Sequence, residues 1–408
     1  MDTRTITRIL VVSLLLLIPL SIWLIPSTTA AVVGFFVFLA PLWLPLVLLV
    51  IFVPLWVVYV RSQYVMSVPY VTLELKPGDK TPKTAKAMEL IFYSLHHRTP
   101  LSRKMEYIAG QVRLPWSFDI VASDGVVRFY MRIPKSHRQA LEMRIRNEYR
   151  DIDIDEVRDY AREVGYEAPR MHLSVKEYRL AKPDPYPIHT YESYEKNDES
   201  ENPFHILLEK LVGVGEGEHL FISYMVRPHQ RERKKPWERE EDALHHDAQQ
   251  EITSLLGSSA TPKELPEPEQ KLIKHIEDAL KKPSFDCGLR AVYLADNDAY
   301  KESNADLLNT MFESFNDPEL NVFEAYDPRD NVAWPLSDVF AAVPAFGNMF
   351  FYHLYRRRAY FIPPYYGKPF VLNTAELATM FHLPLIRRSS ALARAKGTRL
   401  EPPANLPI

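Results

Sequence analysis

The amino-acid sequence predicts an α+β fold in which an N-terminal transmembrane helical hairpin precedes two similar α+β units. Three observations predict it. Residues 9–60 are apolar and carry no charged side chain. Residues 71–157 alternate between strand and helix patterns in the order strand, helix, strand, strand, helix, strand. The second half of the chain returns to this order and adds a charged helical insertion.

The apolar region contains two runs, Ile9–Ile25 and Ala31–Val60, separated by Pro26-Ser-Thr-Thr. A membrane-spanning helix needs roughly 20 apolar residues, because lipid leaves every backbone polar group to be bonded internally. We therefore expect two spans joined by a tight turn. Three prolines, at positions 41, 45 and 54, should kink the second span.

Positive charge predicts the orientation of this hairpin. Arg4 and Arg8 precede the first span and Arg61 follows the second, whereas the connecting turn is uncharged. Basic flanks favour the cytoplasmic side, so both chain ends should be cytoplasmic in a multi-pass protein of the inner membrane. The alternative is a signal peptide cleaved near Ala30. It is less favoured because the residues after that site are more apolar than those before it.

Composition sets further bounds on the soluble part. The net charge is −3 over 408 residues, which gives no global field to attract nucleic acid. The single cysteine, Cys287, excludes an intrachain disulfide and a thiolate zinc site. This is consistent with a reducing compartment.

The first unit is expected over residues 62–182. Strands are predicted at 71–75, 118–121, 126–133 and 152–157, with helices at 84–97 and from Pro134 to about Arg150. Asp124-Gly125 between apolar runs is a hairpin signal. This order predicts a split βαβ, or ferredoxin-like, domain. A further strand is expected at 171–180.

The second unit is expected over residues 183–335 and is predicted to repeat the ferredoxin-like pattern of strands and helices. Asn202 as N-cap and Pro203 as first residue begin a helix that should end at Gly213. Strands are predicted at 220–227 and 285–295 and a helix at 304–315, with the helical insertion at about 229–282.

Residues 336–408 form the predicted C-terminal docking segment, which is aromatic and basic. Asn373 and Glu376 stand in capping-box relation at the start of a short helix that Pro384 should close. Arg356, Arg357 and Arg358 lie among tyrosines, a combination suited to gripping phosphates beside bases. The same residues could instead contact anionic lipid or an acidic protein surface.

Known catalytic patterns are absent from the sequence. No glycine starts a phosphate-binding loop, and the glycines at 213–217 follow a helix and indicate a helix end and a turn. Glu241, Asp242, His245 and His246 could place two metal ligands on one helix face, but no third ligand has matching spacing. We therefore expect no catalytic residues, no metal and no cofactor. Cys287 is expected to be a buried small side chain.

The C-terminal motifs resemble a known family. They are Phe370–Pro384, Pro402-Pro-Ala-Asn-Leu-Pro407, Tyr186-Pro-Ile188 and Phe285–Ala295. Together they are similar to the region preceding the motor in membrane-anchored conjugative DNA-transfer and type IV secretion ATPases of the HerA and FtsK class, in their candidate-phylum bacterial form. In those relatives the Pro-Pro-Ala-Asn-Leu-Pro segment leads into the ATPase domain, whereas this chain stops at Ile408.

The resemblance implies a non-enzymatic membrane scaffold that tethers a P-loop translocation ATPase in trans within a type IV secretion or conjugation-like system. The docking residues would be Asn373, Glu376, Leu377, Phe381, His382 and Pro384, with nucleic-acid or lipid contact by Arg356, Arg357, Arg358, Arg387 and Arg388. We also expect a homo-oligomer. The competing hypothesis is a membrane-bound metal-dependent hydrolase that uses the cluster at Glu241–His246.

Overall fold

The computed structural model describes residues 30, 33–35, 37–78, 85–96, 102–194, 202–230, 242–257, 265–332, 343–362 and 365–384. The chain divides into two compact units, residues 1–60 and 61–408. In the first, the described helix α3 (Ala40–Ser67) begins, and it continues into the second unit. By length and composition, α3 is able to cross a membrane. The first predicted span, Ile9–Ile25, lies outside the described residues.

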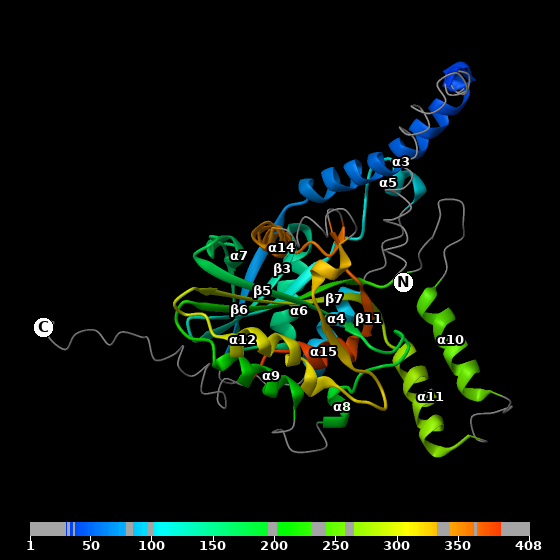
Figure 1. Cartoon of the computed structure of the whole chain (residues 1–408). Helices are drawn as coiled ribbons and strands as arrows, with labels where there is room; N and C mark the ends of the chain where they lie inside the picture. The colour runs from blue at the N-terminus through cyan, green and yellow to red at the C-terminus, as the bar shows by residue number, and fades with distance from the viewer. Residues whose placement is uncertain are drawn as a thin grey trace, which may run out of the picture. The chain divides into compact units, whose positions relative to one another are not determined.

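The second unit is built on one antiparallel sheet, which has nine strands in the described part of the chain (Figure 1). Along the sheet the order is β4 (Ile152–Val157), β1 (Tyr70–Pro77), β3 (Val126–Pro134), β2 (Trp116–Ser123), β6 (Glu218–Pro228), β7 (Ser284–Asp296), β5 (Met171–Leu180) and β8 (Phe323–Tyr326). A ninth strand, β11 (Phe370–Asn373), also pairs with β7.

The two halves of this sheet have the same internal order. Counted along the chain, the strands of the first half lie in the order fourth, first, third, second, and those of the second half repeat this order as β8, β5, β7, β6. Strands β2 and β6 pair antiparallel, with Ile120 opposite Ile222, and so join the halves into one sheet. The strand β5, which the predicted boundary at residue 182 assigns to the first unit, pairs with β7 and β8 of the second.

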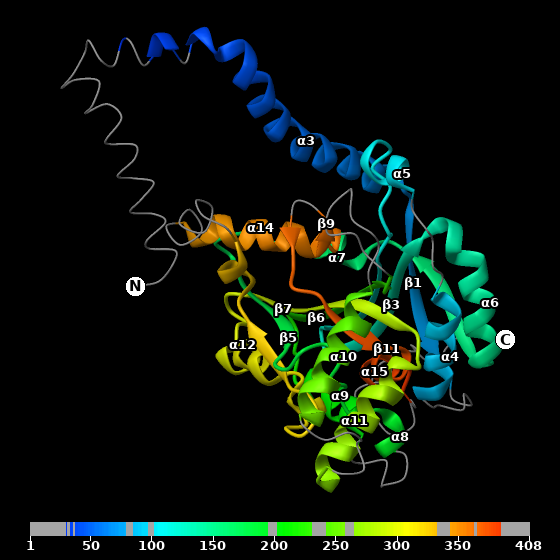
Figure 2. The ribbon, with the colours of Figure 1, turned by 90° about the vertical axis from the view of Figure 1, so that its right-hand side faces the viewer.

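Helices from both halves cover one face of the sheet and enclose a continuous apolar core (Figure 2). They are α4 (Ala85–Leu95), α6 (Arg138–Glu148), α9 (Pro203–Val212), α12 (Glu302–Leu307) and α15 (Thr374–Met380). Two single turns, η4 (Leu308–Thr310) and η5 (Glu313–Phe315), follow α12 in place of the one helix predicted at 304–315. The hydroxyl of Tyr178 donates to the Leu308 carbonyl at 2.5 Å, where the regular helix ends.

The opposite face of the sheet is covered by α7 (Tyr160–Glu163), α14 (Pro344–Arg357) and the short hairpin of β9 (Phe361–Ile362) and β10 (Tyr365–Tyr366). Between β6 and β7 the chain makes the helices α10 (Ala243–Leu256) and α11 (Glu267–Leu280), which pack on each other. These two helices occupy the predicted insertion. Single turns of helix, α5 (Arg103–Tyr107) and α8 (Tyr191–Tyr194), lie in the connections.

Candidate functional site at the α14 face

The face of the sheet beneath α14 carries charged side chains in the middle of its strands. Arg358, which follows α14 in a left-handed conformation at φ 50°, donates to Asp119 at 3.1 Å and to Asp159 at 2.9 Å. Its side chain is only 3% exposed. The buried guanidinium therefore attaches the end of α14 to β2 and to the start of α7.

A second ion pair lies farther along the same face. Arg290 and Glu177 are both fully buried, and their closest atoms are 2.6 Å apart. The hydroxyls of Tyr326 and Tyr365 donate to the other carboxylate oxygen of Glu177 at 2.8 and 2.7 Å. Arg290 also donates to the carbonyl of Ala359 at 2.9 Å. This pair connects β5 and β7 to β8 and to the segment that follows α14.

The third cluster surrounds Asp286 at the start of β7. Its carboxylate accepts from Arg113 at 3.1 Å, from Arg227 at 2.9 Å and from His229 at 2.5 Å. Burial alone would raise the pKa of Asp286, but these three partners hold it at about 2. The same contact and charge outweigh the burial of His229 and raise the pKa of its imidazole.

These clusters are not arranged as catalytic groups. A general base works best with a pKa near the operating pH and with a lone pair directed at a substrate, whereas Glu177 and Asp286 are surrounded by donors. A further carboxylate, Glu218, accepts from Tyr293, Asn304, Gly215 and Lys301, and its pKa is held at about 2 against its burial. The clusters of Arg358 and of Arg290 with Glu177 instead hold the end of α14 and the β9–β10 hairpin on the sheet.

Two acids, the half-buried Asp184 and the buried Glu376, have raised pKa values. Burial raises the pKa of Asp184 to about 6 and that of Glu376 to about 7. Both line a cavity of about 10 Å³, which is close to the smallest volume that holds one water molecule. A cavity of this size has no room for a substrate.

The predicted docking segment forms part of the interior. Strand β11 extends the sheet along the start of β7, with Phe370 opposite Cys287, and all seven residues of α15 are buried. The predicted capping box is confirmed, since Asn373 accepts from Glu376 N at 3.1 Å and Glu376 accepts from Asn373 N at 2.7 Å. The second oxygen of Glu376 accepts from Ile188 N, also at 2.7 Å.

The six residues proposed for docking are therefore packed inside the fold. Asn373, Glu376, Leu377, Phe381, His382 and Pro384 are all buried. Leu377 and Phe381 belong to the main core, and burial lowers the pKa of His382 to about 4, so that it is neutral at pH 7. A partner could reach these side chains only if the segment left the sheet. The structure assigns them to the core, and their docking role stays a prediction.

The basic residues fall into three groups. Arg358 is buried and paired with two carboxylates, so its guanidinium does not reach the surface. Arg357 is exposed and Arg356 is half-buried. Arg387 and Arg388 lie outside the described residues.

The metal hypothesis gains no support from the described part of the chain. Among those residues no group of three or more His, Cys, Asp or Glu side chains could hold a metal ion. Asp242 caps α10 by accepting from His245 N at 3.3 Å, and His246 contacts Gln250. Glu241 lies outside the described residues.

Two other interpretations of the sequence are confirmed. Gly213 is the C-cap of α9, and Cys287 is buried at 3% exposure. The charged clusters, by contrast, are not predicted. Their signal is a charged residue inside an apolar strand, as in Phe118-Asp-Ile-Val121 and Leu289-Arg-Ala-Val292. Such residues are rarely buried unless they are paired, but the sequence does not reveal the partner.

A protein-family model matches the part of the chain that forms most of the sheet. The model of a family described as a domain of unknown function (DUF8128) matches residues 68–331. The chain belongs to this family. The DUF8128 match starts just before β1 and ends within the turn η6 (Pro328–Asn331), so it includes β1 to β8. The helices α14 and α15 and strand β11 lie beyond the DUF8128 match. A comparison with curated proteins finds no match.

Proposed function

We propose that this protein is a non-enzymatic, membrane-anchored component of a type IV secretion or conjugation-like system that positions a P-loop translocation ATPase supplied by another chain. The observation that carries the proposal is the way α3 joins the folded domain. Val65, in the last turns of α3, packs against Met225, Tyr360 and Phe361. Arg61 pairs with Glu106 at 3.2 Å. The last turns of this helix, Arg61–Ser67, are thereby packed on the rest of their unit.

The buried, paired charge clusters also favour a scaffold. A domain that uses its buried carboxylates to hold elements together keeps few groups poised for chemistry. The resemblance of the C-terminal motifs to the pre-motor region of conjugative ATPases supplies the kind of partner. Because every side chain of Phe370–Pro384 except the half-buried Val371 is buried, we assign ATPase docking to the chain after Pro384, which carries Arg387, Arg388 and the proline-rich motif.

The fold of each half belongs to the same proposal. We infer that both halves are ferredoxin-like, which the strand order and the helices after the first and third strands support. An experimental structure with a parallel pair of neighbouring strands in either half would contradict this. The expected homo-oligomer stays a prediction, and the mass of the detergent-solubilised particle measures it.

The test is capture of the motor from membranes of the source organism. The tagged full chain should retain a P-loop ATPase identified by mass spectrometry, and a variant ending at Pro384 should lose it. The matched control is Arg356→Glu/Arg357→Glu, which alters charge elsewhere and should retain the ATPase. If the full chain captures no P-loop ATPase, the proposal is wrong. Equal capture by full and shortened chains would move docking onto the folded domain.

A further inference from the structure

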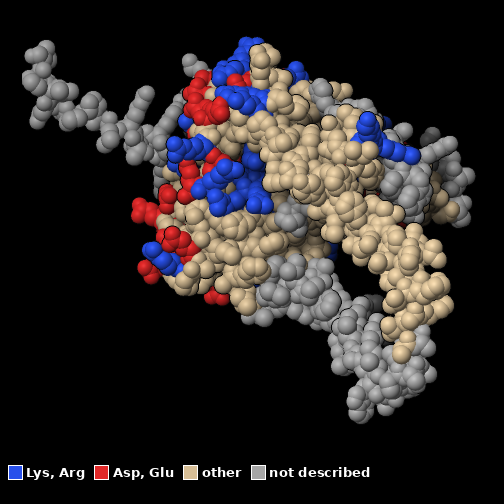
Figure 3. Space-filling model, turned by 90° about the horizontal axis from the view of Figure 1, so that it is seen from above, with Lys and Arg blue, Asp and Glu red and all other residues tan. Residues whose placement is uncertain are grey.

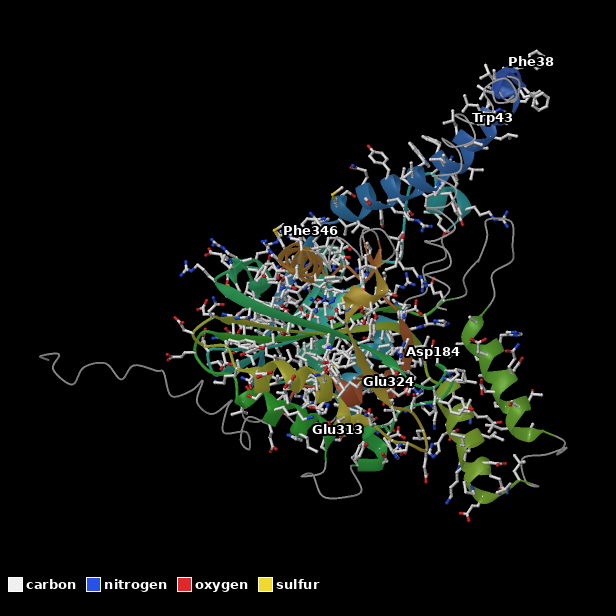
Figure 4. The ribbon with its side chains drawn as sticks, in the orientation of Figure 1. Phe38, Trp43, Asp184, Glu313, Glu324 and Phe346 are labelled. Carbon is white, nitrogen blue, oxygen red and sulfur yellow. The ribbon has the colours of Figure 1, made fainter. Side chains whose placement is uncertain are left out.

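The helix α14 has apolar side chains on both of its sides. One side packs on the sheet through Phe351, Tyr352, Leu354 and Tyr355. On the other side Phe346 is 43% exposed and Met349 is 45% exposed, and Val343 just before the helix is 50% exposed. Figure 4 shows Phe346 on the outer side of α14. A surface helix of a soluble domain usually places polar residues there.

The charge of α14 is one-sided as well. The helix contains no acidic residue and ends in Arg356 and Arg357. By helical spacing these arginines lie on the same side as Met349 and His353. Because Arg358 is neutralised by Asp119 and Asp159, the charge left for an outside partner is that of Arg356 and Arg357. Figure 3 looks onto this face and shows Lys and Arg beside a broad uncharged area.

The C-terminal end of α14 lies next to the last turns of α3. Residues Arg61–Ser67 of α3 belong to the same compact unit as α14, and Val65 packs against Tyr360 and Phe361, which follow α14. The apolar part of α3 ends at Val60. A helix rises about 1.5 Å per residue, so Val65 lies only about 8 Å along α3 from Val60.

A second exposed apolar patch lies beside the same turns of α3. In and after α5, Met105 is 41% and Ile108 is 61% exposed, and α5 also carries Arg103 and Lys104. The ion pair of Arg61 with Glu106 attaches α5 to α3. Two separate elements, α5 and α14, therefore place apolar and basic side chains near the last turns of α3.

We propose that the exposed side of α14 is a second membrane contact, with Val343, Phe346 and Met349 at the level of the lipid headgroups and Arg356 and Arg357 on anionic lipid. Amphipathic helices that lie in the membrane interface combine an apolar face with basic residues in this way. Single-stranded nucleic acid also uses basic residues, but it stacks on aromatic rings and gives no reason to expose Val343 and Met349. The inference rests on the anchoring part of the proposed function and is independent of the ATPase.

The test uses the full chain in nanodiscs whose lipids carry a quencher in the headgroup region or, in a parallel sample that reports on the span, in the acyl chains. Cys287 is buried and can stay in place. A fluorophore is attached to Met349→Cys, to Met143→Cys on α6, which is 57% exposed on the other side of the sheet, or to Val50→Cys in the apolar part of α3. Each position is measured in neutral phosphatidylcholine and in a mixture with phosphatidylserine.

Lipid should quench positions 349 and 50 and leave position 143 unaffected. Phosphatidylserine should increase the quenching at 349. Each basic residue near an anionic surface strengthens binding about fivefold, so Arg356→Glu/Arg357→Glu should abolish that increase. Equal quenching at 349 and 143, with position 50 quenched, overturns the inference but leaves the anchor intact. An unquenched position 50 overturns both.

Nucleic acid is the remaining alternative, and the same label separates it from lipid. A short single-stranded DNA is added to the nanodiscs that carry the label at position 349. We expect no change in emission. If the DNA alters the emission and phosphatidylserine does not, the surface is a nucleic-acid site and the inference is wrong.

Discussion

At the scale of single residues, the protein is distinguished by charges buried inside apolar strands. Asp119, Glu177, Asp286 and Arg290 are at most 6% exposed, and each contacts an opposite charge. Removing charges from water costs several kcal/mol per ion, so such pairs seldom stabilise a protein more than apolar packing would. The directional contacts of Asp119, Glu177 and Arg290 instead select one position for the end of α14 and the β9–β10 hairpin.

The pair of Arg290 with Glu177 provides the sharpest test of this view. Replacement of Arg290 by Met leaves the Glu177 carboxylate buried without its cation, which should lower the free energy of unfolding by about 3–5 kcal/mol. The double variant Glu177→Gln/Arg290→Met removes both charges and should recover part of this loss. Urea unfolding in detergent measures each value.

The control for this cycle is the pair of Arg179 with Glu324, whose side chains are each 47% exposed. Its removal should cost about 0–1 kcal/mol. An equal cost at the two pairs would contradict the argument from burial.

The contact of His229 with Asp286 should make stability depend on pH. The pKa of His229 is raised in the folded state, so its stabilising effect is complete below about pH 6.5, the usual value for the unfolded chain. The effect is lost as the pH rises through the folded pKa. Urea unfolding between pH 6 and 9 should therefore show a decline for the native chain and a flatter curve for His229→Gln.

The exposed residue His275 is the matched control for that measurement. The variant His275→Gln should keep the decline of the native chain. Parallel curves for the native chain and His229→Gln would show that the imidazole contributes nothing to the pH dependence.

At the scale of elements, the ring of Tyr360 adds to the contacts that hold the β9–β10 hairpin. A Cβ atom added to Gly288 or to Gly367 would lie 2.4 Å from the ring of Tyr360, so the two glycines enclose the ring. The Tyr360 hydroxyl donates to the Lys368 carbonyl at 2.8 Å. The glycine at position 288 is thus required for close approach inside a strand.

Replacement of Gly288 by Ala should displace Tyr360 and reduce stability by about 1–3 kcal/mol, the usual cost of overpacking. The double variant Gly288→Ala/Tyr360→Leu should recover part of the loss. A thermal unfolding series in detergent measures both. The control is Gly165→Ala, where the added Cβ meets nothing within 4 Å. A harmless Gly288→Ala would mean that the ring has room to move.

At the scale of the whole molecule, two halves with the same strand order share one sheet and one main core. The C-terminal segment completes this core through β11 and α15, although it lies beyond the DUF8128 match. The folded domain therefore includes residues on both sides of the region that defines the family.

The orientation of this domain relative to the membrane is a testable consequence of the flanking arginines. Because Arg4, Arg8 and Arg61 favour the cytoplasmic side, Met143→Cys should react with a membrane-impermeant maleimide only after lysis of spheroplasts. Thr28→Cys, in the predicted turn between the spans, should react in intact spheroplasts. Labelling of position 143 before lysis would reverse the orientation, and protection of position 28 would argue against two spans.

Local signals explain how much of the fold could be predicted. Asp124 and Gly125 have φ values of 52° and 77°, as the predicted Asp-Gly hairpin turn requires. Asn202 caps α9 with Pro203 in its first turn, and Asn373 and Glu376 form their capping box. Each of these features depends on residues within a few positions of one another, and the sequence contains all of them.

By itself, the sequence determined the apolar helix, the order of most strands and helices, their caps and the place of the insertion. Only the tertiary structure decided what these elements do together. It placed Phe370–Pro384 in the core, because β11 pairs with a strand about 85 residues earlier in the chain. It also joined Arg358 to Asp119 across 239 positions. Periodicity and capping act over one or two turns, whereas burial of a charge depends on which distant partner the fold brings to it.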